Sequence, residues 1–328
     1  MAGVAPSTVS FVLNGKARQM RISEALEKKV IALAKTSGYH PNQVAVSLRT
    51  GKSKILGLIV ESISGHFFAS LAKIIEDEAQ VHGYRVVYCS TENDPKKGSD
   101  LIRMLSQRQV DGYLITPTQG MEKDIRELSA ANKPLVLIDS YFPKINVPYV
   151  LVDNQAGIHE GMQHLFKQGY KKIGFVTIDL DLIQMKHRED AYLDALKQKK
   201  IAVNRSFILK VPYNSGKEAV IQAISNFIKR SKGLDAIFFG ANYLGIAGLE
   251  SIRLAGLRIP GDIGMICFDD DDLFRLYPPG ITSIQQPVEE IAKTAIQLLM
   301  TQIANGKINI RKSQLQLAPN FIVRGSTR

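Results

Sequence analysis

Short apolar runs alternate with amphipathic segments along most of the chain, from about residue 55 onward. A first series of apolar runs lies at residues 55–60, 84–89, 112–116 and 134–139, and a second series lies at 172–177, 206–211, 236–240 and 263–268. The segments between these runs have helical periodicity. Strands that are continuous apolar runs and alternate with helices are typical of parallel sheets covered on both faces. The pattern therefore predicts an α/β fold with two lobes, each built on a doubly wound parallel sheet.

The length and composition of the chain agree with this prediction. The chain has 328 residues, of which 45% are hydrophobic, which is enough for one large core or two medium ones with a small appendage. Ligands of open α/β sheets bind at the carboxyl ends of the strands. Two facing lobes would place these edges on the two sides of one cleft, so we expect a ligand there.

The first 54 residues predict short helices instead of strands. Pro6 suits the first position of a helix that extends to Asn14. One face of this helix is apolar and the opposite face carries Ser7, Ser10, Phe11 and Asn14. Ser23 is a good N-cap for a second helix, which ends at Gly38. Helices this short are not stable alone, so they must pack against each other or against another segment.

Basic residues are concentrated in the same segment. Residues 1–54 hold nine Lys and Arg side chains and two Glu, a net charge of +7 out of +11 for the whole chain. A basic module on a nearly neutral body is typical of polyanion binding, because neutralised phosphates release counterions; nucleic acid fits better than a membrane surface. No apolar run approaches the roughly 20 residues of a membrane span, and the first residues lack the basic region followed by an apolar region that is typical of a signal peptide. We expect a cytoplasmic, nucleoid-associated protein that makes no membrane contact.

The sequence contains no motif for enzymatic, cofactor or metal chemistry. It has no GxGxxG, P-loop or GxSxG pattern and no convincing pair of nucleophile and base. Cys89 and Cys267 lack the CxxC spacing of a zinc site, and we expect both thiols to be buried and reduced. Residues 269–272 are four aspartates, which cannot all face one ion, so a loop that caps the next helix is expected. We predict no enzymatic activity, no cofactor and no metal.

Four stretches of the chain, in this order and spacing, resemble the LacI/GalR family of bacterial transcription repressors: AGVAPSTVSFVLNG, GYHPNQVAVSLRTGKS, ILGLIVESISGHFFASLAKIIEDEAQVHGY and ICFDDDDLFRLYPPGITSIQQP. The resemblance covers essentially the whole chain. It implies an N-terminal helix-turn-helix, a hinge helix that enters the DNA minor groove, and a two-lobed core similar to periplasmic sugar-binding proteins. Such a core dimerises and binds a small effector.

The resemblance divides the chain into three parts. They are a partial, all-α helix-turn-helix module at 1–41, a hinge helix and linker at 42–54, and an effector-binding and dimerisation core at 55–328. Within the core we expect an N-lobe of about 55–152 plus 286–314 and a C-lobe of about 153–285 plus 315–328. From composition alone, residues 39–54 are equally compatible with a flexible basic linker.

The family's helix-turn-helix usually begins further upstream, with a first helix that precedes the AGV stretch. Residues 6–14 then correspond to the recognition helix, and its supporting helix is missing from the sequence. The apolar residues Val9, Val12 and Leu13 would lose burial worth roughly 1.5 to 3 kcal/mol for each large side chain. We expect either a start codon upstream of Met1 or weak binding of DNA.

The resemblance also identifies candidate DNA-contacting residues, which are Pro6, Ser7, Thr8, Ser10, Phe11, Asn14, Ser23, Asn42, Leu48 and Arg49. Leu48 matches the family's leucine that wedges between bases, Asn42 would begin the hinge helix, and Arg49 would meet a phosphate. Phe11 either contacts a thymine methyl group in the major groove or folds over the loop that follows it. The hinge helix is expected to fold only on DNA.

Candidate effector-binding residues follow from the same resemblance, and they are Phe67, Phe68, Asp139, Arg188, Asn242, Asp269 and Gln286. An arginine and carboxylates make charge-assisted hydrogen bonds to hydroxyls, and aromatic rings cover the apolar side of a sugar. The expected effector is a sugar or a sugar phosphate. The alternative is that both phenylalanines are core residues and that Arg188 and Asp269 form a surface ion pair. Ala191 and Tyr243 depart from the usual family residues, so the effector is expected to be unusual.

The sequence therefore predicts a sequence-specific DNA-binding repressor, a homodimer whose affinity for a double-stranded operator is controlled by a small effector bound between two lobes. Rotation of the lobes would separate the hinge helices of the dimer. A cytoplasmic sugar-binding protein that has lost DNA binding is the alternative, and an enzyme on a doubly wound fold is a third class. The basic segment argues against the alternative, and the lack of any catalytic motif argues against an enzyme.

Overall fold

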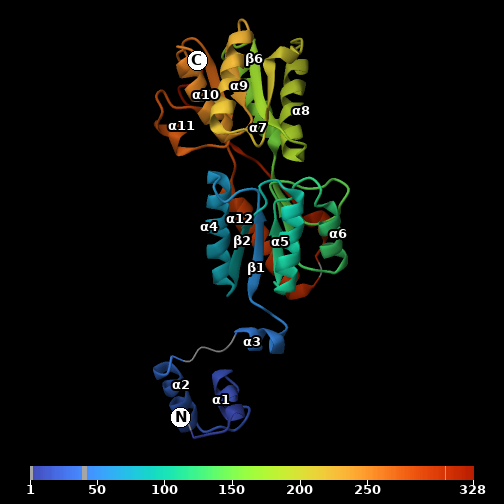
Figure 1. Ribbon diagram of the computed structural model, residues 1–328, viewed down its shortest axis with the longest axis vertical. Coiled ribbons are helices and arrows are strands. Elements are labelled where there is room, and N and C mark those ends of the chain that lie inside the picture. The colour runs from blue at the N-terminus through green and yellow to red at the C-terminus, as the bar shows by residue number, and fades with distance from the viewer. Residues whose placement is uncertain (1–2, 39–42, 307) are drawn as a thin grey trace. The chain divides into compact units, whose positions relative to one another are not determined.

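The computed structural model describes residues 3–38, 43–306 and 308–328. The chain forms two compact units, an N-terminal unit of residues 1–53 and a core of residues 54–328 (Figure 1). Among the described residues, no helix is both long enough and apolar enough to cross a lipid bilayer.

The N-terminal unit contains three helices, α1 (Pro6–Leu13), α2 (Glu24–Thr36) and α3 (Gln43–Thr50). As predicted, α1 begins at Pro6, and the Ser23 hydroxyl caps α2 by accepting a hydrogen bond from the Leu26 N–H (3.4 Å). Their small core consists of Val12, Ala17 and Val30, with partly buried apolar side chains around it.

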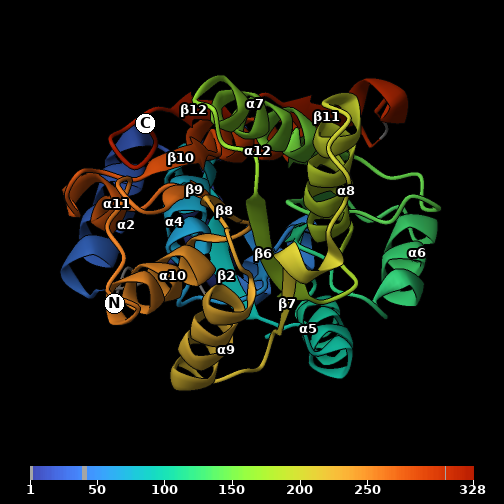
Figure 2. The same cartoon turned by 90° about the horizontal axis from the view of Figure 1, so that it is seen from above.

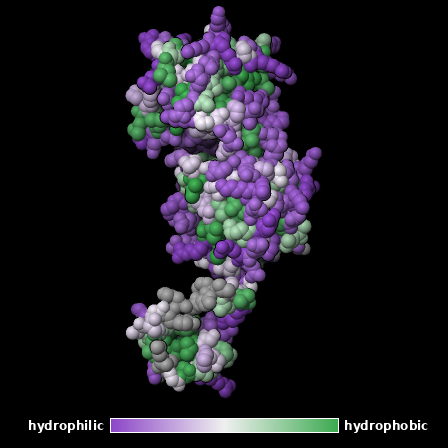
Figure 3. Space-filling view, viewed as in Figure 1, coloured by the Kyte–Doolittle hydropathy of each residue, from purple (hydrophilic) through white to green (hydrophobic). Residues whose placement is uncertain are grey.

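Several large apolar side chains of the N-terminal unit are exposed. Met20 and Ile31 are 47% and 48% exposed, and Leu48 is 75% exposed. Hydrophobic side chains are accordingly visible on this unit in the space-filling view, whereas hydrophilic ones dominate the visible face of the core (Figure 3). The three helices bury few of their apolar side chains, so their fold rests on a small core.

The N-lobe of the core is a sheet of six parallel strands in the order β11-β5-β4-β3-β1-β2. The strands are β1 (Ile55–Val60), β2 (Arg85–Ser90), β3 (Gly112–Ile115), β4 (Leu135–Ile138), β5 (Tyr149–Val152) and β11 (Gln314–Leu317). The helices are α4 (His66–Val81) and α12 (Val288–Asn305) on one face and α5 (Pro95–Gln107) and α6 (Glu122–Ala130) on the other (Figures 1 and 2). Both faces of the sheet are therefore buried, which explains its continuous apolar runs.

The C-lobe repeats this plan with the order β12-β10-β9-β8-β6-β7, in which only β12 is antiparallel to its neighbour. The strands are β6 (Ile173–Asp179), β7 (Ile208–Pro212), β8 (Ala236–Phe239), β9 (Gly264–Phe268), β10 (Thr282–Gln285) and β12 (Asn320–Ile322). The helices are α7 (Asn154–Lys167) and α8 (Ile183–Gln198) on one face, α9 (Lys217–Arg230) and α10 (Asn242–Leu254) on the other, and the short α11 (Asp272–Leu276). Two 3₁₀ turns lie at Arg205–Phe207 and Ile310–Ser313.

The chain passes between the lobes after β5, after β10 and after β11. The expected division after residue 314 is wrong, because β11 pairs in parallel with β5, from Gln314 opposite Tyr149 to Leu317 opposite Val152. The segment Gln-Leu-Gln-Leu has the alternation of a strand with one buried face, and the first turn-forming residue after it is Pro319. The third crossing therefore lies at residues 318–319.

Candidate functional site

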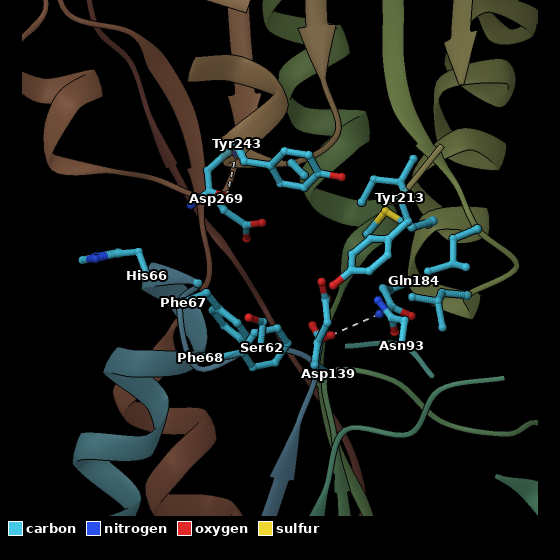
Figure 4. A pocket seen from close by; sticks show the side chains of 18 of the residues that line it. Ser62, His66, Phe67, Phe68, Asn93, Asp139, Gln184, Tyr213, Tyr243 and Asp269 are labelled. Atoms are coloured by element: carbon cyan, nitrogen blue, oxygen red, sulfur yellow. Dashed lines mark hydrogen bonds between the residues drawn. The ribbon is translucent and has the colours of Figure 1, made fainter. Parts of the chain in front are cut away.

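A cavity of about 620 Å³ lies between the two lobes of the core, at the carboxyl ends of their strands. Its walls include all seven of the predicted effector-binding residues, Phe67, Phe68, Asp139, Arg188, Asn242, Asp269 and Gln286. Figure 4 shows Phe67, Phe68 and Asp139 on the N-lobe side and Tyr243, Tyr213 and Asp269 on the C-lobe side. We call this space the inter-lobe cavity.

Arg188, on α8, is the most completely held side chain of the cavity. It is 2% exposed. Its Nε donates to Asn154 Oδ1 (2.7 Å), its Nη1 donates to the Gly240 carbonyl (2.6 Å), and the guanidinium lies 3.6 Å from the centre of the Phe268 ring. Asp269 Oδ2 is 3.7 Å from Nη1. The alternative of a surface ion pair is therefore wrong, because this arginine is buried and is held by groups on α7, after β8 and at the end of β9.

Asp139 and Asp269 occupy corresponding positions, one residue after β4 and one residue after β9. Both have a left-handed backbone, with φ of +65° and +68°, a conformation that aspartate tolerates better than most residues. Each accepts a hydrogen bond from the amide of a buried glutamine, Gln184 Nε2 to Asp139 (3.1 Å) and Gln286 Nε2 to Asp269 (2.6 Å).

Burial dominates the electrostatics of Asp139, which is 7% exposed. Desolvation raises its pKa to about 7; the Arg188 charge opposes this, and the carboxylates of Asp269 and Glu61 add to it. Burial also lowers the pKa of Arg188, against the attraction of Asp269 and Asp139. The single guanidinium therefore does not compensate the carboxylates around it.

Glu61 is a cavity residue that the sequence did not single out. It directly follows β1, and burial raises its pKa; the Tyr213 hydroxyl lowers it, and the charges of Glu92 and Asp269 raise it. Tyr213 follows β7, and burial and the Glu61 carboxylate raise the pKa of its phenol. The position of both residues directly after strands is the signal that could have identified them.

Within the part of the chain that the structure describes, three buried polar side-chain atoms of the cavity walls have no hydrogen-bond partner. They are Gln184 Oε1, Gln286 Oε1 and Asn93 Nδ2. Leaving a buried polar group unpaired costs about 1–3 kcal/mol, so such atoms at a cavity wall are typical of a binding site. Asn242 also lines the cavity, and its Oδ1 accepts a hydrogen bond from the Tyr243 N–H (2.8 Å).

The two phenylalanines belong both to the apolar core and to the cavity wall. Phe68 is 8% exposed and belongs to the apolar core of the N-lobe, and Phe67 is partly buried against the same core. The rings meet edge to face with their centres 5.0 Å apart. Both also line the inter-lobe cavity, so they offer an apolar surface at the amino end of α4.

The run of four aspartates is divided among different tasks. Asp269 lines the cavity, and Asp270 forms a bidentate salt bridge with Arg324 (2.7 and 2.8 Å). Asp271 caps α11 by accepting a hydrogen bond from the Leu273 N–H (2.9 Å). Asp272 forms an ion pair with Arg275 (3.3 Å). The predicted helix-capping loop is confirmed. Within the described ranges, no three His, Cys, Asp or Glu side chains converge as metal ligands.

Both cysteines have free thiols. Cys267 is buried, but Cys89 is only half-buried, so the expected burial holds for Cys267 alone.

Most of the predicted DNA-contacting residues lie on accessible parts of the N-terminal unit. Pro6, Ser7, Ser10 and Asn14 are exposed, whereas Thr8 and Phe11 are half-buried. Asn14 Oδ1 accepts a hydrogen bond from Arg49 Nη2 (2.6 Å), so DNA would have to compete for both side chains. The Ser23 hydroxyl is engaged as the cap of α2, and Asn42 lies outside the described residues.

Comparisons with known proteins agree over both units. A model of bacterial regulatory proteins of the lacI family matches residues 1–42, and a model of the periplasmic binding protein-like domain matches residues 162–327. The ribose operon repressor of Haemophilus influenzae is 30% identical, with 99% of this chain and 96% of that protein aligned. The transcriptional repressor PurR of Photobacterium profundum is 29% identical over 100% of this chain and 96% of its own length.

A solved structure of a complex between the transcriptional regulator CelR and cellobiose has a similar fold. The superposition covers 99% of this chain and 97% of the CelR chain, with 23% sequence identity and a TM-score of 0.73. These matches span the helical N-terminal unit and the two-lobed core. The chain therefore belongs to the lacI family of bacterial regulatory proteins, and it is a DNA-binding transcriptional regulator with a periplasmic-binding-protein-like core.

Proposed function

We propose that the chain acts as a homodimeric repressor whose affinity for an operator is set by a small polyhydroxylated effector in the inter-lobe cavity. The main support for this proposal is that charged and unpartnered polar groups of both lobes, among them Asp139, Arg188 and Asp269, converge on one cavity. A ligand that contacts both lobes favours the lobe orientation in which those contacts form. If the hinge helix senses that orientation, the effector and the operator are thermodynamically coupled.

On the DNA side, the proposal assigns base and phosphate contacts to α1 and α3. Ser7, Ser10 and Asn14 present polar groups on the exposed side of α1, and Phe11 is not one of the side chains that pack against the small core of this unit. Leu48 is 75% exposed, as a minor-groove wedge must be before it meets DNA. The net charge of residues 1–54, +7, supports a strongly salt-dependent affinity.

On the effector side, the cavity supports a molecule with many hydroxyls. The Arg188 donors that remain, the carboxylates and the unpartnered amide atoms match hydroxyl groups, and Phe67 and Phe68 offer a surface for an apolar ring face. The names of a ribose operon repressor and of a regulator bound to cellobiose among the similar proteins agree with a sugar-like ligand.

A decisive test compares Leu48→Ala with Leu254→Ala, a control on α10 whose side chain is 63% exposed. The operator is first selected from random DNA, and affinities are measured by gel shift at several salt concentrations. We expect Leu48→Ala to weaken operator binding by a few kcal/mol, the order of an unstacking wedge, and Leu254→Ala to leave it unchanged. Effector affinity of both variants should equal that of the wild type.

Two results would contradict the proposal. Equal operator affinity of Leu48→Ala and the control would remove the wedge from the mechanism. Binding of sugars without any selected DNA sequence would instead favour a sugar-binding protein without DNA function. Sedimentation of the unmodified chain tests the dimer.

A further inference from the structure

The charge that lines the inter-lobe cavity is strongly unbalanced. Its carboxylates are Glu61, Glu92, Asp139, Asp269 and Asp271. Among the described residues that line it, Arg188 is the one guanidinium, His66 is the other ionisable base, and there is no lysine. An anionic effector would enter a field of its own sign, because these carboxylates outnumber the cation.

Arg188 cannot reverse this balance, because its contacts are already committed. Its Nε and Nη1 bind Asn154 and the Gly240 carbonyl, and its nearest carboxylate is Asp269, at 3.7 Å. A phosphate group is usually bound by an arginine fork or by several basic groups together. Here two of the five N–H groups of one guanidinium are already used by protein acceptors, and no second basic group lies beside it among the described lining residues except His66, so the cavity is poorly suited to a phosphoryl group.

The hydrogen-bonding inventory shows the same asymmetry. Gln184 and Gln286 are 3% and 5% exposed, both line the cavity, and the Oε1 of each has no partner, while their Nε2 groups are engaged by Asp139 and Asp269. Carbonyl and carboxylate oxygens only accept hydrogen bonds. Two of the three unpartnered buried atoms of the cavity walls, Gln184 Oε1 and Gln286 Oε1, therefore accept hydrogen bonds, and one, Asn93 Nδ2, donates. A protonated amine supplies three donors and no acceptor.

Glu61 and Asp139 are the two carboxylates of the cavity whose pKa burial raises. Both belong to the N-lobe, and within the described residues neither has an ion-pair partner within 4 Å, unlike Asp269 and Asp270. Burial and the proximity of other carboxylates raise the pKa of both, which means that their ionised forms are unfavourable in the empty cavity. A cation seated between them would relieve this repulsion.

We propose that the effector carries a protonated amine on a polyhydroxylated frame, with the amine against Glu61 and Asp139, and that sugar phosphates and sugar acids are rejected. The proposal rests on the proposed function of the cavity and narrows it to one chemical class, of which an amino sugar with a free amino group is the simplest member. It replaces the sugar phosphate among the effectors that the sequence suggested. The aromatic rings of Phe67 and Phe68 favour such a molecule over a bare polyamine.

The test is calorimetric titration of the full chain in a buffer without primary amines. The probes are glucosamine, galactosamine and mannosamine, each with its parent hexose, its N-acetyl derivative and its 6-phosphate. We expect at least one amino sugar to bind at least about tenfold more tightly than its parent hexose, its N-acetyl derivative and its 6-phosphate, because its amine forms one additional ion pair in the cavity. Spermidine and calcium chloride are included as cations without a sugar frame.

Glu61→Gln separates charge from shape, because it is isosteric and removes only the carboxylate. The variant should lose about tenfold of the affinity for the preferred amino sugar and keep its affinity for the parent hexose. Without any ligand it should unfold at a higher urea concentration than the wild type at pH 8, since a repulsive charge has gone. Glu127→Gln, on the exposed surface of α6, is the charge-matched control and should change neither quantity.

Each other outcome overturns the inference. Equal or tighter binding of the hexoses, acetylated sugars or phosphates overturns it while the proposed function survives, provided that binding alters operator affinity. Binding of spermidine or calcium in place of amino sugars overturns the sugar frame. Failure of every probe to bind, or an unchanged preference in Glu61→Gln, overturns the amine. The proposed function fails separately if no bound compound changes operator affinity.

Discussion

The N-lobe and the C-lobe share the strand order of five parallel strands, and Asp139 and Asp269 stand at the corresponding place in each. Both aspartates have the same left-handed backbone and a glutamine amide as donor. They differ in their counter-charge. Arg188 lies in the C-lobe, 3.7 Å from Asp269, whereas within the described residues Asp139 forms no ion pair within 4 Å and the nearby Glu61 adds repulsion.

This difference shows how one architecture can supply two kinds of contact. On the C-lobe side, Asp269 lies 3.7 Å from the guanidinium of Arg188, which is held by Asn154 and the Gly240 carbonyl; this arrangement suits the orientation of hydroxyls. The N-lobe side keeps uncompensated negative charge, which suits the recognition of a ligand's charge. A ligand that contacts both sides would couple the lobes, because the repulsion on the N-lobe side is relieved only when the ligand is present.

The largest effect is expected when the counter-charge is removed. Arg188→Met replaces a buried guanidinium by an apolar chain and leaves Asp269, Asn154 and the Gly240 carbonyl without their partner. We expect a loss of about 3–5 kcal/mol of unfolding free energy. Effector affinity should fall about thirtyfold or more, which corresponds to about 2 kcal/mol. Urea unfolding and calorimetry measure the two quantities.

Two further variants isolate the cause. Arg253→Met, on the exposed surface of α10, should leave stability and affinity within measurement error. Arg188→Lys keeps the charge and loses the fork geometry, so it should recover part of the stability and little of the affinity. If Arg188→Met folds as stably as the wild type, the C-lobe side is not neutralised by this residue and the contrast between the lobes disappears.

The next effect concerns the aspartates and pH. In the folded chain the pKa of Asp139 is raised to about 7 by burial, against the Arg188 charge and with the charges of Asp269 and Glu61. A carboxyl group with a raised pKa stabilises the fold fully below its unfolded pKa, and this contribution is lost as the pH rises through the folded pKa. Wild-type stability should therefore fall between about pH 4 and pH 7, by up to about 4 kcal/mol from this group.

Asp139→Asn should abolish that slope and stabilise the ligand-free chain at pH 8. Asp269→Asn should do the opposite and cost about 1–3 kcal/mol, because it removes the carboxylate nearest to the buried Arg188. Urea midpoints of the three proteins between pH 4 and pH 8 decide the matter. Similar pH profiles for the two variants would mean that the lobes are electrostatically equivalent.

Strands that are continuous apolar runs were predictable, whereas strands that contain polar residues were not. The runs at 55–60 and 112–116 differ from β1 and β3 by at most one residue. The strands β10 and β11 have the sequences TSIQ and QLQL, which are too short and too polar for periodicity to distinguish them from loops. Their places are fixed by pairing with distant strands, and for this reason the expected lobe boundary after residue 314 was wrong.

The cavity was partly predictable, and the limit has a physical reason. The resemblance selected Arg188 and Asp269, of which Asp269 directly follows β9 and Arg188 lies in the second turn of α8. Glu61 and Tyr213 were not predicted as site residues, because each is an ordinary polar residue after a strand. They become neighbours only because the two lobes face each other. The uses of the four aspartates depend likewise on Arg324, far away in the sequence.

The smallest expected effect is the difference in stability between variants of the two glutamines, Gln184 and Gln286. Gln184→Leu removes the amide donor of Asp139, and Gln286→Leu removes that of Asp269. Asp269 retains Arg188 nearby and is 14% exposed at its side chain, so water can replace the lost donor. Asp139 is more deeply buried, so Gln184→Leu should cost about 1 kcal/mol of stability at pH 8 and Gln286→Leu less than about half of that.

Both glutamine variants also lose a carbonyl oxygen that has no partner in the empty cavity, so each should weaken effector binding about fivefold, one hydrogen bond's contribution. Gln222→Leu, on the exposed surface of α9, is the matched control. A larger stability loss in Gln286→Leu than in Gln184→Leu would reverse the comparison, because Asp269 and not Asp139 would then be the carboxylate that depends on its glutamine.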